Sequence, residues 1–241
     1  MTSIFNRVPP TAGVLRSAGV WRSVLFGACG FCLTLCVGLA APAARADTLI
    51  NLIAPAARAD TVLTTIGVGQ GPVGIAITPN GRYAYVADSG GDAVSVIDTA
   101  SNTLAGGLIP VGKHPLCIAI TPDGKYVYVA TDDGVSVIAT ANNTVVGSPI
   151  PVSILSFDIV ITPDGKYVYV ANMLGSTVSV IATATNTVMG NPIPVGKIPS
   201  NIAITPDGKY VYVATHDGVS VIATATNSVV GRPIPVGTHP L

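Results

Sequence analysis

The chain has 241 residues, enough for one or two domains, and only 10% of them are charged. All twelve acidic residues are Asp, and from Asp47 onward eight Lys and Arg stand against them, a net charge of −4, which excludes the basic stripe that binds nucleic acid. Glu, a good helix former, is absent, whereas Val, Ile, Thr and Gly are frequent, so the composition favours an all-β fold.

Residues 1–46 are predicted to form a secretory signal peptide. Three Arg precede an apolar run, Val24–Ala41, and the tripeptide Ala44-Arg45-Ala46 fits the small-x-small pattern of a cleavage site. The apolar run is just long enough to cross a bilayer, so an uncleaved membrane anchor is the alternative. We therefore expect a secreted or cell-envelope-associated protein.

The following segment, residues 47–60, is predicted to be a linker. The octapeptide APAARADT occurs at 41–48 and again at 54–61, so an alternative cleavage site follows Ala59. Three of the four Cys lie in the leader, and a disulfide within the mature chain is therefore not expected. The fourth, Cys117, lies in an apolar strand, which predicts a buried, inert thiol, with a reactive or intermolecular thiol as the alternative.

Residues 61–241 consist of a repeated unit. A turn of sequence Thr-Pro-Asp/Asn-Gly marks each copy, and its proline recurs at spacings of 43, 41 and 43 residues, at Pro79, Pro122, Pro163 and Pro206. A period of about 40–45 residues with several short strands is typical of β-propeller blades. The sequence therefore predicts an all-β propeller of four-stranded antiparallel blades, with about four blades present.

The second repeat illustrates the expected blade. Its strands are predicted at Leu116–Thr121, Lys125–Ala130, Val135–Ala139 and Thr144–Val152. In the turn after the first strand, Pro122 fixes φ and Gly124 takes the left-handed position that closes a hairpin. The second strand places Tyr126 and Tyr128 on one face and valines on the other, so both faces are expected to be buried between neighbouring blades.

The sequence TPDGKYVYVA, followed by VSVIATATNTV and IPVG, resembles the YVTN β-propeller repeat. The equivalent tetrapeptides carry Ala as their third residue and begin at Tyr85, Tyr128, Tyr169 and Tyr212. The resemblance, to a WD40/YVTN-like repeat, covers residues 61–241. It implies secreted or cell-surface propellers, usually seven-bladed, related to quinoprotein-dehydrogenase and lactonase propellers, and it implies no common activity or catalytic set.

Four units are complete. A truncated fifth unit begins at Pro235. Thr61–Gly69 matches the fourth strand of a blade, but the first three strands of that blade do not precede it. We expect an incomplete ring, with pairing of two chains and a closed four-bladed ring as alternatives. The end blades of an incomplete ring would expose apolar faces, which favours self-association through them.

Ligand binding is expected on the variable loops that connect the second strand to the third and the fourth strand to the next blade, because these loops share one end of the blades. The residues with functional groups there are Lys113, His114, Asp132, Asp133, Lys197, His216 and Asp217. The aspartates have an alternative role as turn residues. Two metal interpretations remain, a site of His114, His216 and Asp217, and a weak calcium site of Asp88 and Asp92.

The sequence offers few catalytic groups. It has no Glu and no Gly-x-Ser-x-Gly motif, and its one Trp, Trp21, lies in the leader, so quinone-binding and WD-type propellers fit poorly. We expect an exported, non-enzymatic propeller without a cofactor, serving as a binding or surface-scaffold module for a protein or a small-molecule ligand. The alternatives are a lactonase-like or quinoprotein-like enzyme and a truncated remnant of a longer repeat protein.

Overall fold

A computed structural model describes residues 62–153 and 155–236, so the predicted signal peptide, the linker and residues 237–241 lie outside the described residues. All described residues belong to one compact unit. Within the described ranges no helix is long and apolar enough to cross a membrane. Four antiparallel sheets account for the strands of this region.

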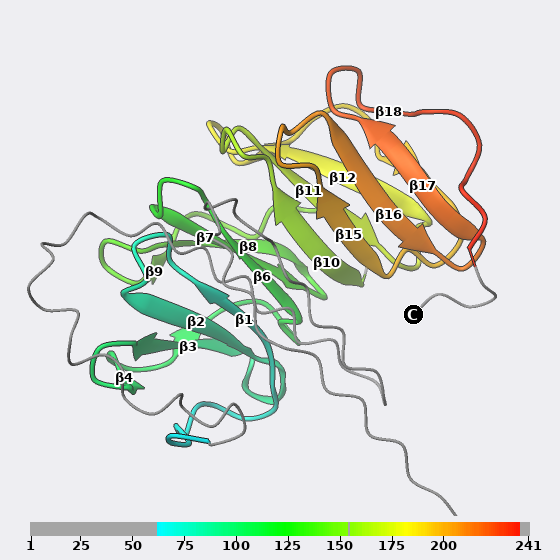
Figure 1. The fold of residues 1–241 in the computed structure, drawn as a ribbon. Coiled ribbons are helices and arrows are strands. Elements are labelled where there is room, and N and C mark those ends of the chain that lie inside the picture. The colour runs from blue at the N-terminus through cyan, green and yellow to red at the C-terminus, as the bar shows by residue number, and fades with distance from the viewer. Residues whose placement is uncertain (1–61, 154, 237–241) are drawn as a thin grey trace, which may run out of the picture. The chain divides into compact units, whose positions relative to one another are not determined.

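Each sheet is one blade (Figure 1), and its first four strands are hydrogen-bonded in chain order, while a short fifth strand in blades 1 and 3 pairs with the third strand. Blade 1 contains β1 (Pro72–Ile77), β2 (Tyr83–Asp88), the 3-10 turn η2 (Ser89–Gly91), β3 (Ala93–Asp98), β4 (Thr103–Leu104) and β5 (Ile109–Pro110). Blade 2 contains β6 (Cys117–Ile120), β7 (Tyr126–Thr131), β8 (Gly134–Ala139) and β9 (Thr144–Val145). Blade 3 contains β10 (Ser156–Ile161), β11 (Tyr167–Asn172), β12 (Thr177–Ala182), β13 (Thr187–Val188) and β14 (Ile193–Pro194). Blade 4 contains β15 (Asn201–Ile204), β16 (Tyr210–Thr215), β17 (Gly218–Ala223) and β18 (Ser228–Val229).

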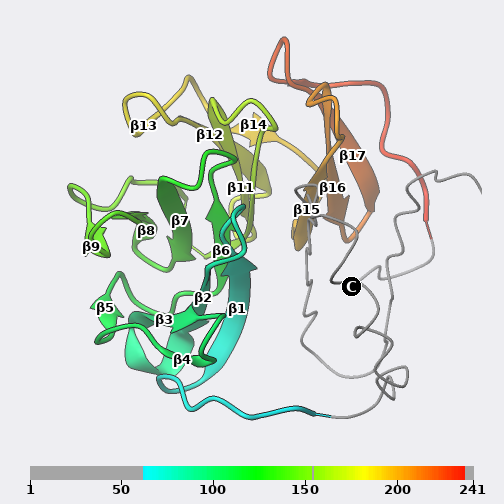
Figure 2. The ribbon, with the colours of Figure 1, turned by 60° about the vertical axis from the view of Figure 1, so that its left-hand side comes forward.

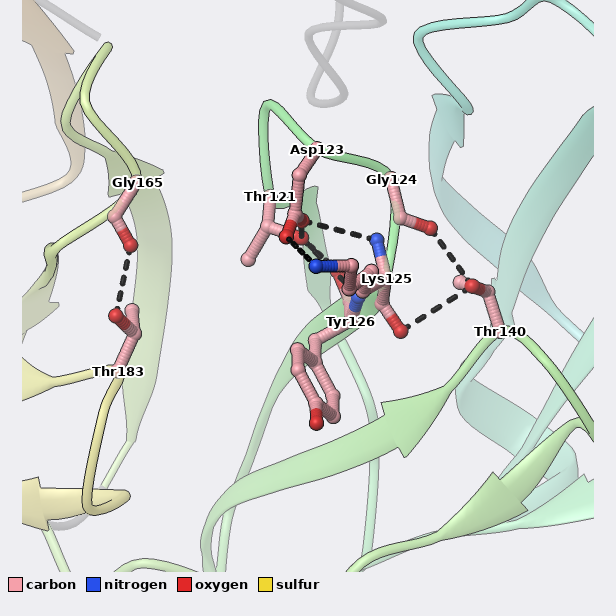
Figure 3. A network of polar contacts seen from close by, with 8 residues as sticks. All are labelled: Thr121, Asp123, Gly124, Lys125, Tyr126, Thr140, Gly165 and Thr183. Carbon is pink, nitrogen blue, oxygen red and sulfur yellow. Dashed lines mark hydrogen bonds and ion pairs between the residues drawn. The ribbon is translucent and has the colours of Figure 1, made fainter.

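The turn between the first two strands is held by the same polar contacts in every blade, shown for blade 2 in Figure 3. The hydroxyl of Thr121 donates to Oδ1 of Asp123 (2.6 Å), which also accepts the backbone N–H of Lys125 (3.0 Å). These contacts hold the pKa of Asp123 below its usual range, chiefly through the Thr121 hydroxyl. Gly124 has a φ of 72°, so the predicted left-handed position in this turn is confirmed.

The fourth strand differs from its prediction. Residues Thr144–Val152 were expected to form one strand, but only β9 pairs with β8, and Ile150 adds an isolated bridge to Val135. Gly147 has a φ of 68°, which turns the chain away from β8 directly after β9. Pro149 and Pro151 then supply no N–H for a continuous ladder.

The blades pack face to face, as the burial of both faces of the second strand predicted. Their first strands, β1, β6, β10 and β15, lie side by side in that order (Figure 1 and Figure 2). On β7, Tyr128 is fully buried on one face and Val127 and Val129 are fully buried on the other, although Tyr126, near the turn, is 37% exposed. The expected all-β propeller of four-stranded blades is therefore confirmed.

A tyrosine–asparagine hydrogen bond joins each blade to the next. The hydroxyl of Tyr85 donates to Oδ1 of Asn143 over 2.6 Å, and the equivalent bonds, at the same distance and the same separation of 58 residues, are Tyr128–Asn186 and Tyr169–Asn227. All three tyrosine side chains are fully buried, and burial raises their pKa to about 12. Each acceptor is the last residue of the turn between the third and fourth strands and has a left-handed backbone.

Asp158 on β10 makes a further contact between blades. Its Oδ2 accepts the backbone N–H of Ile202 on β15 (2.9 Å), and its Oδ1 accepts the N–H of Ile159 (2.8 Å). Burial raises the pKa of Asp158, while these bonds and one to Cys117 of blade 2 oppose the rise. Asp158 therefore connects the first strands of three successive blades.

The buried tyrosines predict an alkaline transition. Because their folded-state pKa of about 12 exceeds the ordinary value near 10, the folded state is stabilised below pH 10 and loses this contribution as pH rises toward 12. A spectrophotometric titration should show that Tyr85, Tyr128 and Tyr169 ionise well above pH 10. Ionisation of these three tyrosines near pH 10, with the fold intact, would contradict the interblade bonds.

Replacement of Asp158 tests the second contact. Asp158→Ala leaves the N–H of Ile202 without its acceptor, and we expect the free energy of unfolding to fall by about 2 kcal/mol in chemical denaturation. The matched control is Asn201→Ala, because Asn201 occupies the equivalent position on β15 and its side chain makes no hydrogen bond to the described residues. Equal losses of unfolding free energy in the two variants would show that the Asp158 carboxylate does not stabilise the contact between blades.

Candidate functional site

The loops expected to carry function do share one end of the blades. Here a B–C loop joins the second and third strands of a blade, and a D–A loop precedes its first strand. In blade 2 the N–H of Asp132 donates to the carbonyl of Lys113 (2.8 Å), and in blade 4 the N–H of His216 donates to the carbonyl of Lys197 (2.7 Å). In blades 1 and 3 the equivalent N–H groups, of Ser89 and Met173, donate to the carbonyls of Gly71 and Leu155, one residue further along the D–A loop. This end is called the loop face below.

One residue of each D–A loop has a left-handed backbone. The equivalent residues, with φ between 45° and 60°, are Gly71, His114, Leu155 and Ile198. This conformation is costly for every residue but glycine, and most costly for the β-branched Ile198. The side chain of His114 is 62% exposed and Ile198 is 50% exposed, so the strained positions present these two residues on the loop face.

Blade 2 brings together the four residues predicted there. Nδ1 of His114 lies 2.8 Å from Oδ2 of Asp132, whose side chain is 30% exposed. The backbone N–H of Lys113 donates to Oδ2 of Asp133 (3.1 Å). The N–H of His114 donates to Oδ1 of Asp92 from blade 1 (2.8 Å). The imidazole is thus fixed at Nδ1 by a carboxylate, and its loop is anchored to the preceding blade.

Blade 4 holds the other three predicted residues in a looser arrangement. Nδ1 of His216 lies 3.4 Å from Oδ1 of Asp217, and the N–H of Lys197 donates to its Oδ2 (3.3 Å). The bond from Lys197, followed by the contact with His216, lowers the pKa of Asp217. The proposed metal trio is not brought together, since the described residues contain no group of three or more His, Cys, Asp or Glu able to hold a metal ion.

The fourth residue of each tetrapeptide supports its B–C loop, a role that the sequence analysis missed. The four side chains are at most 1% exposed, at Asp88, Thr131, Asn172 and Thr215. Where two residues separate the second and third strands, a Thr hydroxyl donates to the Gly carbonyl that follows them, as in Thr131 to Gly134 (2.9 Å). Where four residues separate the strands, an Asp or Asn stands at this position instead of Thr. Comparison of the four copies by loop length shows that Thr goes with the short loops and Asp or Asn with the long ones.

One position on the first strand of each blade, which the sequence analysis did not select, holds a different residue in each copy. Gly74, Cys117, Asp158 and Asn201 occupy equivalent register positions, each opposite an alanine of the second strand. The predicted burial of Cys117 is only partial, and its thiol contacts Asp158. Because both oxygens of Asp158 accept backbone N–H groups, this carboxylate serves the junction between blades.

Two grooves lie away from the loop face. One, of about 630 Å³, runs between the outer strands of blades 1 and 2 and is lined by residues 105–110 and 142–145. The other, of about 530 Å³, lies between the Thr-Pro-Asp-Gly turns of blades 3 and 4 and includes Asp164 and Asp207. Neither groove contains a histidine, so the His114–Asp132 pair is the better candidate for acid–base chemistry.

Comparisons with known proteins agree with this fold. A model of the lactonase family, described as a seven-bladed β-propeller, matches residues 153–239, and a model of the LVIVD repeat matches residues 75–103. No curated protein has a sequence that matches this chain.

Solved structures with the same fold include enzymes. Hydrazine synthase of Kuenenia stuttgartiensis is 27% identical with a TM-score of 0.65, covering 74% of this chain and 54% of its own. A candidate 6-phosphogluconolactonase of Bacteroides fragilis is 25% identical with a TM-score of 0.55, covering 65% and 52%. Another, of Bacteroides uniformis, is 22% identical with a TM-score of 0.57, covering 71% and 58%. The chain thus spans little more than half the length of these proteins.

These findings correct one expectation from the sequence. A non-enzymatic protein was expected because Glu and the usual nucleophile motif are missing. The match of residues 153–239 to a lactonase family, together with the lactonase-like neighbours, contradicts that expectation. The error arose because absent motifs were taken to exclude enzymes, although a histidine oriented by a carboxylate needs neither Glu nor a serine elbow.

Proposed function

We propose that this chain carries four blades of a lactonase-like propeller that hydrolyses small lactones at its loop face. The observation that carries the proposal is the 2.8 Å contact between Nδ1 of His114 and Oδ2 of Asp132. The lactonase match supports the reaction class, although it covers residues 153–239 rather than blade 2. The names of the two Bacteroides neighbours suggest sugar-acid lactones as the substrate class.

The chemistry follows from the pair. Asp132 accepts a hydrogen bond from the N–H at Nδ1 and so leaves Nε2 of His114 as the basic nitrogen, on an imidazole that is largely exposed on the loop face. Nε2 removes a proton from water, the oxygen attacks the lactone carbonyl carbon, and an oxyanion forms. The ring C–O bond then breaks, and the imidazolium returns its proton to the leaving alkoxide, giving the hydroxy acid. The exposed Lys113 beside His114 supplies positive charge for the oxyanion.

The finer identity of the repeat and the location of the protein belong to the same proposal. The tetrapeptides that begin at Tyr85 and its equivalents support a YVTN-type repeat. The basic and apolar pattern of residues 1–46 supports export to the cell surface or medium, with residues 47–60 as a linker before the blades. The substrate would then be a small molecule outside the cytoplasm, and no nucleic acid is involved.

Loss of His114 should abolish the activity. With glucono-δ-lactone and its 6-phosphate as probes, we expect acid release in a pH-stat to fall by about a hundredfold or more in His114→Ala, because the general base is gone. Asp132→Asn should lower kcat more than it raises KM, because the imidazole loses its orienting acceptor. His216→Ala is the matched control and should retain full activity. Equal activity in His114→Ala and the unmodified protein would refute the assignment.

Export can be tested separately. We expect the protein recovered outside the cytoplasm to begin at Asp47, or at Asp60 if the second APAARADT copy is used. Intact mass and N-terminal sequencing distinguish the two sites. An exported protein that still begins at Met1 would favour the membrane anchor over a cleaved signal peptide.

A further inference from the structure

The loops of blade 3 differ in character from the other loops of the loop face. Residues 153–157 and 172–177 contain no charged side chain, whereas the equivalent loops of blades 1, 2 and 4 each contain at least one aspartate. Leu174 in the B–C loop is 66% exposed, and Phe157 at the start of β10 is 39% exposed. Blade 3 has a neighbouring blade on each side, so this exposure does not arise from an uncovered blade face.

Backbone hydrogen bonds join these loops to a third apolar segment. The N–H of Met173 donates to the carbonyl of Leu155 (3.0 Å), so the B–C loop of blade 3 lies on its own D–A loop. At the end of the same B–C loop, the carbonyl of Ser176 accepts the N–H of Val195 (3.0 Å), in the segment that leads to the half-exposed Ile198. The four apolar residues presented by these neighbouring segments are called the apolar patch below: Leu155, Phe157, Leu174 and Ile198.

Two residues of the apolar patch have a strained backbone. Leu155 has a φ of 59° and Ile198 a φ of 50°, whereas blade 1 has Gly71 at the equivalent position. Glycine adopts this conformation without steric cost, and a β-branched residue does so least readily. The fold therefore keeps large apolar side chains at positions that glycine would fill without strain, and strain of this kind is typical of functional sites.

The apolar patch adjoins the His114–Asp132 pair of blade 2. The B–C loop that contains Asp132 leads directly into β8, where Val135 and Ile150 exchange two backbone hydrogen bonds of 2.9 and 2.8 Å. The chain that continues from Ile150 to Leu155 therefore starts beside the loop of Asp132. The first strands of the two blades, β6 and β10, are also in contact. The loop face thus has a polar part with an acid–base pair and, on the next blade, an apolar part.

We propose that the apolar patch binds an alkyl substituent of the lactone whose ring is opened at His114. This inference rests on the proposed function and narrows its substrate class to alkyl lactones, in place of the sugar-acid lactones that the names of the neighbours suggest. The side chains of the patch form no hydrogen bonds, so sugar hydroxyls would lose water there without a replacement. An alkyl chain gains free energy by leaving water at the same place. With the lactone carbonyl at His114, the substituent extends over blade 3.

The test compares two lactones with the same ring, γ-butyrolactone and γ-nonalactone, of which the second carries a pentyl chain. For the unmodified protein in a pH-stat, we expect kcat/KM to be about tenfold or more higher for γ-nonalactone, because part of its chain is removed from water. In Leu174→Ser and in Ile198→Gly this ratio should fall toward one. Glycine fits the left-handed backbone at position 198, and circular dichroism checks that both variants are folded.

Leu104→Ser is the matched control, because Leu104 is 45% exposed on the outer strand β4, and this variant should keep the ratio of the unmodified protein. Hydrolysis of both lactones with equal kcat/KM would overturn the inference and leave the proposed function standing. So would a preference for γ-nonalactone that persists in both Leu174→Ser and Ile198→Gly. If neither these lactones nor glucono-δ-lactone were hydrolysed, the proposed function would fail and this inference with it.

Discussion

The burial of one tyrosine between each pair of blades is the constraint on which the rest of the structure depends. Tyr85, Tyr128 and Tyr169 are fully enclosed, and a phenol hydroxyl enclosed in this way requires an acceptor. Each finds it on an asparagine of the following blade, at the point where the chain turns from the third strand toward the fourth. A blade therefore obtains the covering of its face and the partner of its tyrosine only from its neighbour, which ties its stability to the repeat.

This dependence explains how much of the fold could be predicted from sequence. The period of the turn prolines and the apolar residues on both faces of the second strand are local signals, and both were interpreted correctly. The fourth strand was not, because the left-handed Gly147 interrupts a segment that reads as extended. The partner of Tyr128 lies 58 residues away, and only the spacing of several copies, once the structure pairs them, makes that relation visible.

The candidate site was predictable in part for the same reason. Variation among the loops located Lys113, His114, Asp132 and Asp133 on one end of the blades, where the structure brings them together. The contribution of Asp92 comes from the preceding blade, and its role as acceptor for the N–H of His114 depends on how two blades are placed, which loop composition does not determine. The weak calcium site of Asp88 and Asp92 stays a prediction, and one carboxylate oxygen of Asp92 is used within the loop face.

The loop face depends on this same placement of neighbouring blades. His114 is held by Asp132 of its own blade and by Asp92 of the blade before it, so a junction contributes directly to the position of the imidazole. Blade 4 has a His–Asp contact of its own, but it joins neighbours within one loop at the longer distance of 3.4 Å. The placement of two neighbouring blades therefore bears on the candidate site of blade 2 as directly as it does on the buried tyrosines.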